Sequence, residues 1–340
     1  MKARIFKAMP DAGVINRWER FLADADLVTH YTSPGYFTDP FVDGERFAIF
    51  AEDENEEYCG LMTGVCRQGI VTSGLFSRPQ TAFRTGQDKA EIARTLADGL
   101  EEVCERPELV EIYSWGSVDS WSAEGFSERQ SGESNSVAVL NLSDGADAVF
   151  SGFSQSRRSD IRKAIKAGIL EPIKELETEQ ELAELYEIHR GWKERKGQEP
   201  DTLEQMRFAM NDREYRRTFI TKVDGRVVAG SLYRFCTGGV VEYAANFSLP
   251  EFQKLRPNDL LGWHAIQWAC GAGLKKFSLG GSNLFLRRFG GEVVNTYRYR
   301  RDNSPLRMHD LREKGREIGV GAYGLLPDRM KAGVKRMFAR

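Results

Sequence analysis

Hydrophobic and polar residues alternate in two sets of three short runs, one set in each half of the chain. The runs span 47–51, 58–66 and 69–76 in the first half, and 218–223, 227–236 and 239–247 in the second. Turn-forming Asp, Glu, Asn and Gly residues separate them. Short alternating runs between turns are typical of β-strands, so each set predicts an antiparallel meander.

A helical pattern follows each meander. Residues 88–105 repeat apolar side chains at helical spacing, and residues 258–273 begin at Asn258, a residue suited to cap a helix, and end in glycines. Further strands are expected at 109–115 and 275–280, and a further helix at 178–196. Meander, helix and returning strand together predict a mixed α/β sheet with flanking helices in each half.

The two halves can be aligned as an internal repeat. Gly60 aligns with Gly230 and Cys66 with Cys236, and a Phe-Ser-x-Pro motif ends at Pro79 in one copy and Pro250 in the other. The offset stays at about 170 residues, which predicts two copies of one domain. We expect the first domain in residues 1–150, the second with a linker helix in 151–310, and a basic helical tail in 311–340.

Charge divides the chain at the same place. Residues 1–150 contain 13 Lys+Arg and 26 Asp+Glu, a net charge of −13, whereas residues 151–340 contain 35 and 24, a net charge of +11, giving −2 for the chain. Two explanations are open. The halves attract each other across an interface, or the basic half binds a polyanion such as a nucleotide, tRNA or an anionic membrane.

Cysteine and histidine spacing indicates neither a disulfide framework nor a metal site, because the five cysteines form no CxxC pair and the four histidines are far apart. Apolar runs are much shorter than the roughly 20 residues of a spanning helix, and the start lacks a signal-peptide pattern. We therefore expect a cytoplasmic protein. The basic amphipathic pattern at 327–340 predicts either packing on the protein itself or peripheral contact with the inner face of a membrane.

The second half carries a longer and more specific pattern. It reads Tyr243-Ala-Ala-Asn246, then Pro257-Asn-Asp-Leu-Leu-Gly-Trp263, then Phe-Ser-Leu-Gly-Gly, and then Phe-Leu-Arg-Arg-Phe-Gly-Gly at 285–291. This order resembles the smaller, armless members of the Fem family, which transfer amino acids from aminoacyl-tRNA to peptidoglycan precursors, and related single-chain acyltransferases. The resemblance implies an α/β fold of two tandem GNAT-like domains, each a mixed, mostly antiparallel sheet flanked by helices.

The start of the helix at 258 differs from that of acetyl-CoA-dependent relatives, which bind pyrophosphate there with a glycine-rich turn. Here the turn reads Gln253-Lys-Leu-Arg256-Pro257-Asn. Proline has no N–H to donate, and side chains obstruct a close approach of the backbone. The sequence therefore favours aminoacyl-tRNA as a co-substrate with no bound cofactor, and acyl-CoA as the alternative donor.

The basic segments supply the expected binding residues. The segments at 151–170 and 189–197 are similar to family segments, and the resemblance places Arg195 where the family binds an acceptor pyrophosphate. A family lysine falls at Leu286, so the positive charge moves to the next two positions. We expect Tyr243 and Arg287 to act in catalysis. The residues expected to bind substrate or anions are Arg157, Arg158, Lys163, Lys193, Arg195, Asn246, Arg256 and Arg288.

These features predict an acyltransferase in which an amine attacks an aminoacyl ester directly, so that no covalent enzyme nucleophile is needed. The acceptor would be an amine of a small molecule, a peptide or a cell-wall-type compound. Anionic and lipid-linked acceptors are both included in this expectation. Two alternatives stay open. One is an acyl-CoA-dependent N-acyltransferase in polysaccharide or secondary metabolism, and the other is a catalytically silent tandem GNAT protein that binds tRNA or a glycoconjugate.

Overall fold

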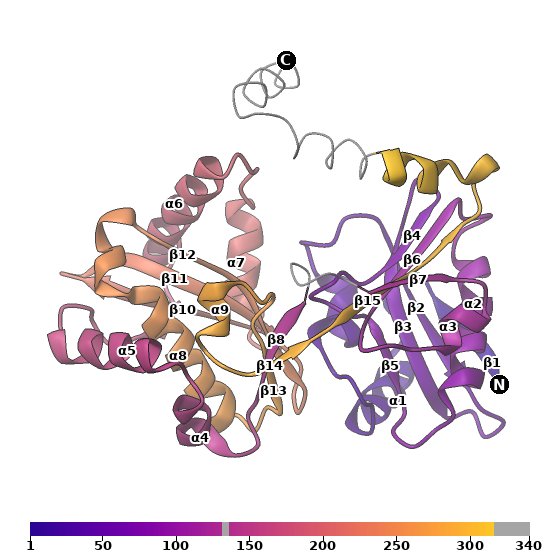
Figure 1. Cartoon of the computed structure of the whole chain (residues 1–340), viewed down its shortest axis with the longest axis horizontal. Coiled ribbons are helices and arrows are strands. Elements are labelled where there is room, and N and C mark those ends of the chain that lie inside the picture. The colour runs from indigo at the N-terminus through magenta and orange to yellow at the C-terminus, as the bar shows by residue number, and fades with distance from the viewer. Residues whose placement is uncertain (131–135, 316–340) are drawn as a thin grey trace.

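The computed structural model describes residues 1–130 and 136–315, and its strands form two separate mixed sheets (Figure 1). The first sheet has the order β1-β2-β3-β4-β6-β15-β7, and β5 pairs with β3 beside β4. Its strands are β1 (Lys2–Phe6), β2 (Glu45–Glu52), β3 (Tyr58–Arg67), β4 (Ile70–Ser73), β5 (Thr81–Phe83), β6 (Leu109–Trp115), β7 (Ser127–Gln130) and β15 (Thr296–Asp302).

The second sheet has the order β14-β8-β13-β12-β11-β10-β9. Pairing in it is antiparallel except between β12 and β13, which run parallel. Its strands are β8 (Val137–Asn141), β9 (Lys174–Glu175), β10 (Arg216–Val223), β11 (Arg226–Phe235), β12 (Val240–Ser248), β13 (Lys276–Ser278) and β14 (Glu292–Val294). The mixed, mostly antiparallel α/β architecture expected from the alternating runs is therefore confirmed.

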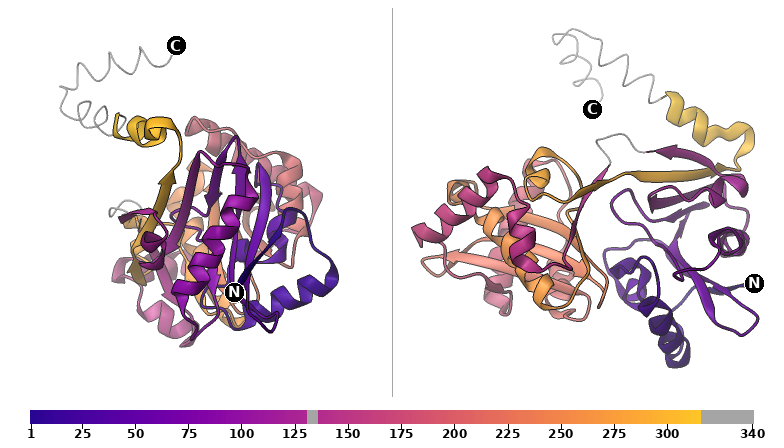
Figure 2. Two further views of the ribbon diagram at one scale, coloured as in Figure 1. Left: turned by 90° about the vertical axis from the view of Figure 1, so that its right-hand side faces the viewer. Right: turned by 60° about the horizontal axis from the view of Figure 1, so that its bottom comes forward.

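The sheets exchange one strand each relative to the predicted division at residue 150. Strand β8 precedes that boundary but pairs with β13 and β14 of the second sheet. Strand β15 comes from the second half but lies between β6 and β7 of the first sheet, as the gold strand in Figures 1 and 2 shows. Alternation of apolar residues predicts a strand but not its partner, so this exchange could not be predicted from the pattern.

Helices cover both faces of each sheet. In the second domain α4 (Gly145–Ser151), α5 (Gln155–Ala167) and α8 (Pro257–Gly271) share a core with β-strand residues such as Phe277, whereas α6 (Glu179–Arg195) and α7 (Leu203–Asn211) cover the opposite face around Phe247. In the first domain α2 (Lys89–Val103) and α3 (Ser120–Ala123) cover one face, and α1 (Ala12–Ala23) packs on the other. A short helix α9 (Leu284–Arg287) follows β13. The 3-10 turns are η1 (His30–Thr32), η2 (Pro34–Thr38), η4 (Pro250–Leu255) and η5 (Pro305–Arg307).

The start of α8 differs in detail from the prediction. Arg256, with a φ of 61°, precedes the helix in a left-handed conformation, and Pro257 is its first residue. The predicted cap, Asn258, lies inside the helix and its Nδ2 donates to Ser248 Oγ at 3.3 Å. Proline suits a first helical position because the N–H that it lacks would have no partner within the helix there.

Within the described ranges, no helix combines the length and apolarity needed to cross a membrane. The basic stretch 327–340 and most of the predicted tail 311–340 lie outside those ranges.

Residues 28–41 of the first domain contact the second domain. Val28 O accepts a hydrogen bond from Val240 N at 2.8 Å, so β12 begins against the first domain. Gly35 packs on the ring of Tyr215, and a Cβ at that position would lie 2.7 Å from the ring. Close contact between the domains therefore depends on a residue without a side chain at position 35.

Candidate active site

Strands β12 and β13 diverge after a short parallel stretch. They pair only over Val240–Glu242 and Lys276–Ser278. Beyond Ser278 the chain stays with β8, because Leu279 N donates to Ala138 O at 2.9 Å and Ala138 N donates to Gly281 O at 3.0 Å. Strand β12 continues to Ser248 paired with β11. In the described part of the chain, the other edge of β12 therefore has no strand partner beyond Glu242, and its backbone groups can pair with an extended ligand.

A bulge lies in β12 where the strands diverge. Tyr233 of β11 pairs with Tyr243, but the preceding Leu232 pairs with Ala245, so Ala244 is the extra residue. Bulges re-aim the side chains around them and occur next to active sites. Here the side chain of Tyr243 packs with the core under α8, and that of Ala245 with the core under α6. The unpaired edge of β12 therefore has side chains that point to both faces of the sheet.

Tyr243 is the predicted catalytic residue that lies at this divergence. Its hydroxyl is buried and, among the described residues, makes no hydrogen bond that meets normal geometry. Burial raises the pKa of Tyr243 well above its ordinary value, the nearby Tyr233 raises it further, and Asn246 and Arg157 oppose the rise. The phenol therefore stays protonated at neutral pH, and it suits a proton or hydrogen-bond donor better than a base.

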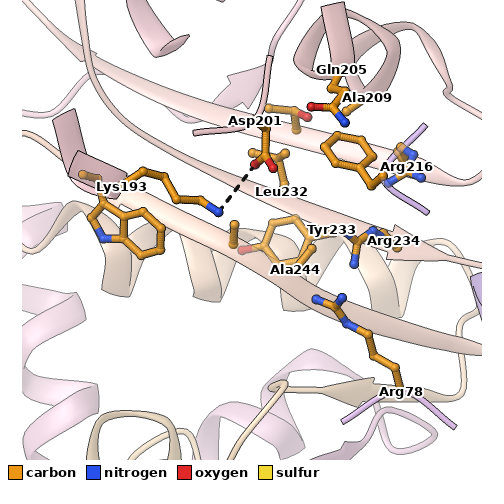
Figure 3. A pocket seen from close by; sticks show the side chains of 14 residues that line it. Arg78, Lys193, Asp201, Gln205, Ala209, Arg216, Leu232, Tyr233, Arg234 and Ala244 are labelled. Atoms are coloured by element: carbon orange, nitrogen blue, oxygen red, sulfur yellow. Dashed lines mark ion pairs between the residues drawn. The ribbon is translucent and has the colours of Figure 1, made fainter. Parts of the chain in front are cut away.

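A cavity of about 280 Å³ lies between the two domains, on the sheet face that carries α6 and α7. The first domain contributes Phe41 and Arg78, and the rest of the wall comes from the second domain (Figure 3). Its charged lining residues are Arg78, Lys193, Asp201, Arg216 and Arg234. Four of these five are basic, so the cavity favours an anionic ligand.

Arg78 and Arg234 share one carboxylate. Arg78 Nε donates to Glu242 Oε1, and Arg234 Nη1 lies 3.5 Å from the same oxygen. Arg78 belongs to the turn between β4 and β5, where Leu75 and Arg78 exchange backbone hydrogen bonds of 3.0 and 2.9 Å. The ring of Tyr31 lies 5.8 Å from the Arg78 guanidinium and 5.5 Å from that of Arg234.

Arg234 is 8% exposed, yet its Nε and Nη1 donate no hydrogen bond to any residue that the structure describes. A buried guanidinium with unused donors is costly unless a ligand supplies acceptors. Glu242 carries one negative charge against the two positive charges of Arg78 and Arg234. The pair therefore retains about one uncompensated positive charge at the cavity wall.

Asp201 is the carboxylate in the cavity wall. Its Oδ2 lies 3.1 Å from His189 Nε2 and 3.9 Å from Lys193 Nζ. Burial acts to raise the pKa of Asp201, but the hydrogen bond with His189 and the charge of Lys193 outweigh it, and the pKa is lowered. Asp201 is therefore ionised at neutral pH and attracts a cationic group.

The predicted anion-binding residue Arg157 is a buried core residue. It is 0% exposed, forms an ion pair with Asp259, and donates to Phe285 O at 2.5 Å. Its guanidinium carbon lies 4.3 Å from the ring centre of Phe285 and 4.0 Å from that of Phe289. These contacts tie α5 to α8 and α9, so this arginine holds the fold together there and does not face solvent.

Three other predicted residues gather where α5 meets the start of α8, and we call this group the α5–α8 surface: Lys163, Arg256 and Arg288. Asp160 lies among them, 2.7 Å from Arg288 Nη2 and 3.7 Å from Arg256 Nη2. Lys163 is exposed and lines a hollow with Arg256. Arg158 donates to the backbone of Ser151 and Phe153. The group retains a net positive charge.

The remaining predicted residues are dispersed. Lys193 lines the cavity, whereas Arg195 is exposed. Asn246 lies on β12 beyond the bulge, close to Tyr243. Arg287 is exposed and its Nε donates to Ser282 O at 2.6 Å, which holds the turn around α9. Leu286, at the family lysine position, is buried in the core under α8.

Sequence reasoning missed the arginines that line the cavity. Arg234 lies within an alternating run, where an arginine is ordinarily assigned to the solvent face, and Arg216 lies just before the run predicted at 218–223. Arg78 lies in a turn of the acidic half. The sequence signal that could have identified Arg78 was the repeated Phe-Ser-x-Pro motif. Arg78 occupies the variable position of this motif in the first copy, and Leu249 occupies it in the second.

Part of the second half of the chain matches a known family model. Residues 155–299 match the family model described as an acetyltransferase (GNAT) domain. That segment holds the divergent strands β12 and β13, the bulge and most of the cavity wall. The match supports the prediction of an acyltransferase enzyme. No curated protein is similar enough to count as a relative.

Solved structures agree over most of the chain. FemX is 13% identical with a TM-score of 0.58, over 74% of this chain and 87% of that one. L-PGS from Bacillus licheniformis is 12% identical with a TM-score of 0.56, over 86% and 92%. A tandem GNAT protein from the clavulanic acid biosynthesis pathway is 12% identical with a TM-score of 0.53, over 89% and 99%. The predicted Fem-like tandem GNAT fold is confirmed, and at these identities the likeness concerns the fold.

Proposed function

We propose that this chain transfers an aminoacyl group from aminoacyl-tRNA to the amine of an acceptor bound in the cavity between the domains. The observation that carries the proposal is the unpaired edge of β12 beyond Glu242. It lies between the α5–α8 surface on one side of the sheet and the cavity on the other. Donor and acceptor would approach from opposite faces and meet beside Tyr243.

The donor end is assigned to the α5–α8 surface because of its charge. Lys163 and Arg256 are exposed there, and the exposed fraction of the Arg256 side chain is 48%. Both can contact successive phosphates of an RNA 3′ end. Pyrophosphate binding at the start of α8 is disfavoured, because Pro257, the first residue of the helix, has no N–H to donate to a phosphate.

The chemistry needs alignment, a proton donor and a deprotonated amine. The amine attacks the ester carbonyl directly, and the new amide forms as the ribose hydroxyl leaves. The neutral Tyr243 phenol would donate a hydrogen bond to the developing oxyanion, or give its proton to the leaving oxygen and regain one from the attacking nitrogen. Ionised Asp201 would attract the acceptor's ammonium group into the cavity before the amine loses its proton.

Binding and transfer can be tested separately. The purified protein should bind a mixed aminoacyl-tRNA pool with a steep salt dependence, and Lys163→Glu with Arg256→Glu should weaken that binding at least 10-fold. The matched control is Arg226→Glu, an exposed arginine at the start of β11, which should change it little. Single-turnover transfer to a panel of amines would then show the reaction.

Acyl-CoA is the second candidate donor. It is favoured by the match to an acetyltransferase domain and by the unpaired β12 edge, which can pair with the amides of a pantetheine arm. Acetyl-CoA binding without tRNA binding would replace the proposed donor by this one. Tight tRNA binding with no transfer to any amine would instead indicate a silent binding protein.

A further inference from the structure

A second cavity, of about 210 Å³, adjoins the first on the side of the first domain. Phe41, Arg78 and Arg234 line both cavities. The two arginines therefore stand between two spaces, one polar and one largely apolar. Figure 3 shows the guanidinium groups of Arg78 and Arg234 turned toward the same part of the first cavity.

The second cavity has a wall suited to an apolar group. It is formed mainly by aromatic and aliphatic side chains, among them Tyr31, Tyr36, Val42, Val65 and Leu75, and its polar members besides the two arginines are Asp43, Thr72 and Gln80. Leu75 is 50% exposed at one side of it, so the space has an apolar side chain facing water until a ligand covers it. The phenols of Tyr31 and Tyr36 stay neutral, because burial raises their pKa values.

The arginine pair sets the charge of the ligand. Glu242 already compensates one of the two guanidinium charges, and buried Arg234 has two unused donor nitrogens. A single carboxylate matches the remaining charge and can accept hydrogen bonds from a guanidinium fork. A group with two negative charges would be only partly compensated.

Size restricts the ligand as well. Cavities of about 280 and 210 Å³ together reach the lower part of the range of small-molecule sites. They suit a molecule of the size of an amino acid derivative, and they are small for a nucleotide-linked peptide.

From these observations we propose that the acceptor is a small amine carrying one carboxylate and one apolar arm of aromatic size. The carboxylate binds between Arg78 and Arg234, the arm enters the second cavity, and the amine lies in the first cavity toward β12. Calling this ligand an acceptor rests on the proposed acyl transfer. The binding chemistry itself does not.

The test measures binding of 3-phenylpropionate to the whole protein by calorimetry, without any donor. It compares propionate, which lacks the arm, and 3-phenylpropan-1-ol, which lacks the charge. We expect 3-phenylpropionate to bind at least 10-fold more tightly than either. Equal affinities for all three would overturn the proposal, as would tighter binding of phenyl phosphate, since that result would contradict the single-charge argument.

Variants assign the two parts of the ligand to their places. Arg234→Gln should remove the advantage of 3-phenylpropionate over the alcohol, and Arg78→Gln provides a second variant should the first fail to fold. Val65→Phe, which fills the second cavity, should remove the advantage over propionate. Arg226→Gln, at an exposed arginine at the start of β11, is the control and should change neither. Unchanged binding in folded Arg78, Arg234 and Val65 variants would overturn the placement.

Failure of this inference and failure of the proposed function are distinguishable. If 3-phenylpropionate binds as expected but no acyl transfer to a carboxylate-bearing amine is found, the ligand chemistry stands and the transfer does not. If transfer proceeds equally well to amines without a carboxylate, the acyltransferase stands and this acceptor class is wrong.

Discussion

Arg216 and Asp39 form a buried ion pair across the boundary between the two domains, with 2.7 Å between Nη2 and Oδ2. Their side chains are 3% and 0% exposed. His30 completes the cluster, with its Nε2 2.9 Å from the same carboxylate oxygen. These contacts fix how the first domain closes the cavity.

Loss of this ion pair should destabilise the protein strongly. Asp39→Asn leaves the Arg216 charge with less compensation in a buried site, and we expect the free energy of unfolding to fall by about 3 kcal/mol. Urea unfolding monitored by tryptophan fluorescence would measure it. Asp43→Asn is the control, because its pair with Arg67 is exposed and should contribute less than about 1 kcal/mol. Equal effects of the two changes would contradict the assignment.

His30 should make stability depend on pH below neutrality. Burial lowers the pKa of His30 to about 4, the neighbouring Arg216 also lowers it, and the hydrogen bond to Asp39 opposes them. The unfolded chain has the ordinary value near 6.5, so it binds more protons than the folded chain between pH 6.5 and 4. Stability is therefore fully present above pH 6.5 and decreases as the pH falls.

The measurement compares wild type with His30→Gln. From pH 7 to pH 5 the wild type should lose about 2 kcal/mol more of its unfolding free energy than the variant does. His309→Gln, at a half-buried histidine outside this cluster, should follow the wild type. A parallel pH dependence in wild type and His30→Gln would show that His30 is not the group responsible.

Tyr243→Phe should lower the transfer rate by about 100-fold with little effect on stability, because the change removes a proton donor that makes no regular hydrogen bond in the described structure. Single-turnover kinetics and thermal unfolding give the two readouts. Tyr233→Phe is the matched control. The Tyr233 hydroxyl donates to Leu261 O, with 3.4 Å between the two oxygens, and Leu261 belongs to α8 and not to the unpaired edge. The variant should therefore cost about 1 kcal/mol of stability and leave the transfer rate intact. The reverse pattern would remove Tyr243 from catalysis.

Arg157 should matter for folding and not for anion binding. Arg157→Met leaves Asp259 buried without its cation, and we expect a loss of about 3 to 5 kcal/mol in unfolding free energy. The double variant Arg157→Met with Asp259→Leu should recover part of that loss, since neither charge is then buried alone. Calorimetric unfolding checks both. A folded single variant of normal stability that loses tRNA binding would restore the predicted binding role.

Most elements of the fold could be predicted from the sequence, because the alternating and helical patterns are strong. The predicted strand 109–115 coincides with β6, and the helix predicted at 178–196 is α6, Glu179–Arg195. Both have a clear apolar face and flanking turn or capping residues. The predicted strand 69–76 ends earlier, at Ser73, because Gly74, with a φ of 86°, turns the chain toward Arg78.

The site was less predictable because its chemistry depends on contacts between distant segments. Tyr243 could be selected from a motif on one strand. Arg78 and Glu242 are 164 residues apart and meet only when the domains close. Arg157 looked like a binding residue because a basic run is ordinarily exposed, yet Phe285, Phe289 and Asp259 enclose it. Pattern alone does not show which arginine of a run points inward.

The exchange of β8 and β15 means that this protein cannot be divided into two working pieces by a single cut. A fragment ending at residue 150 would lack the strand that lies between β6 and β7, and the complementary fragment would lack the strand between β14 and β13. In each fragment the missing strand would leave two neighbouring strands of the sheet with unpaired edges, which favours aggregation. Recombination that moves the acyltransferase domain into another protein therefore has to move both halves of this chain together.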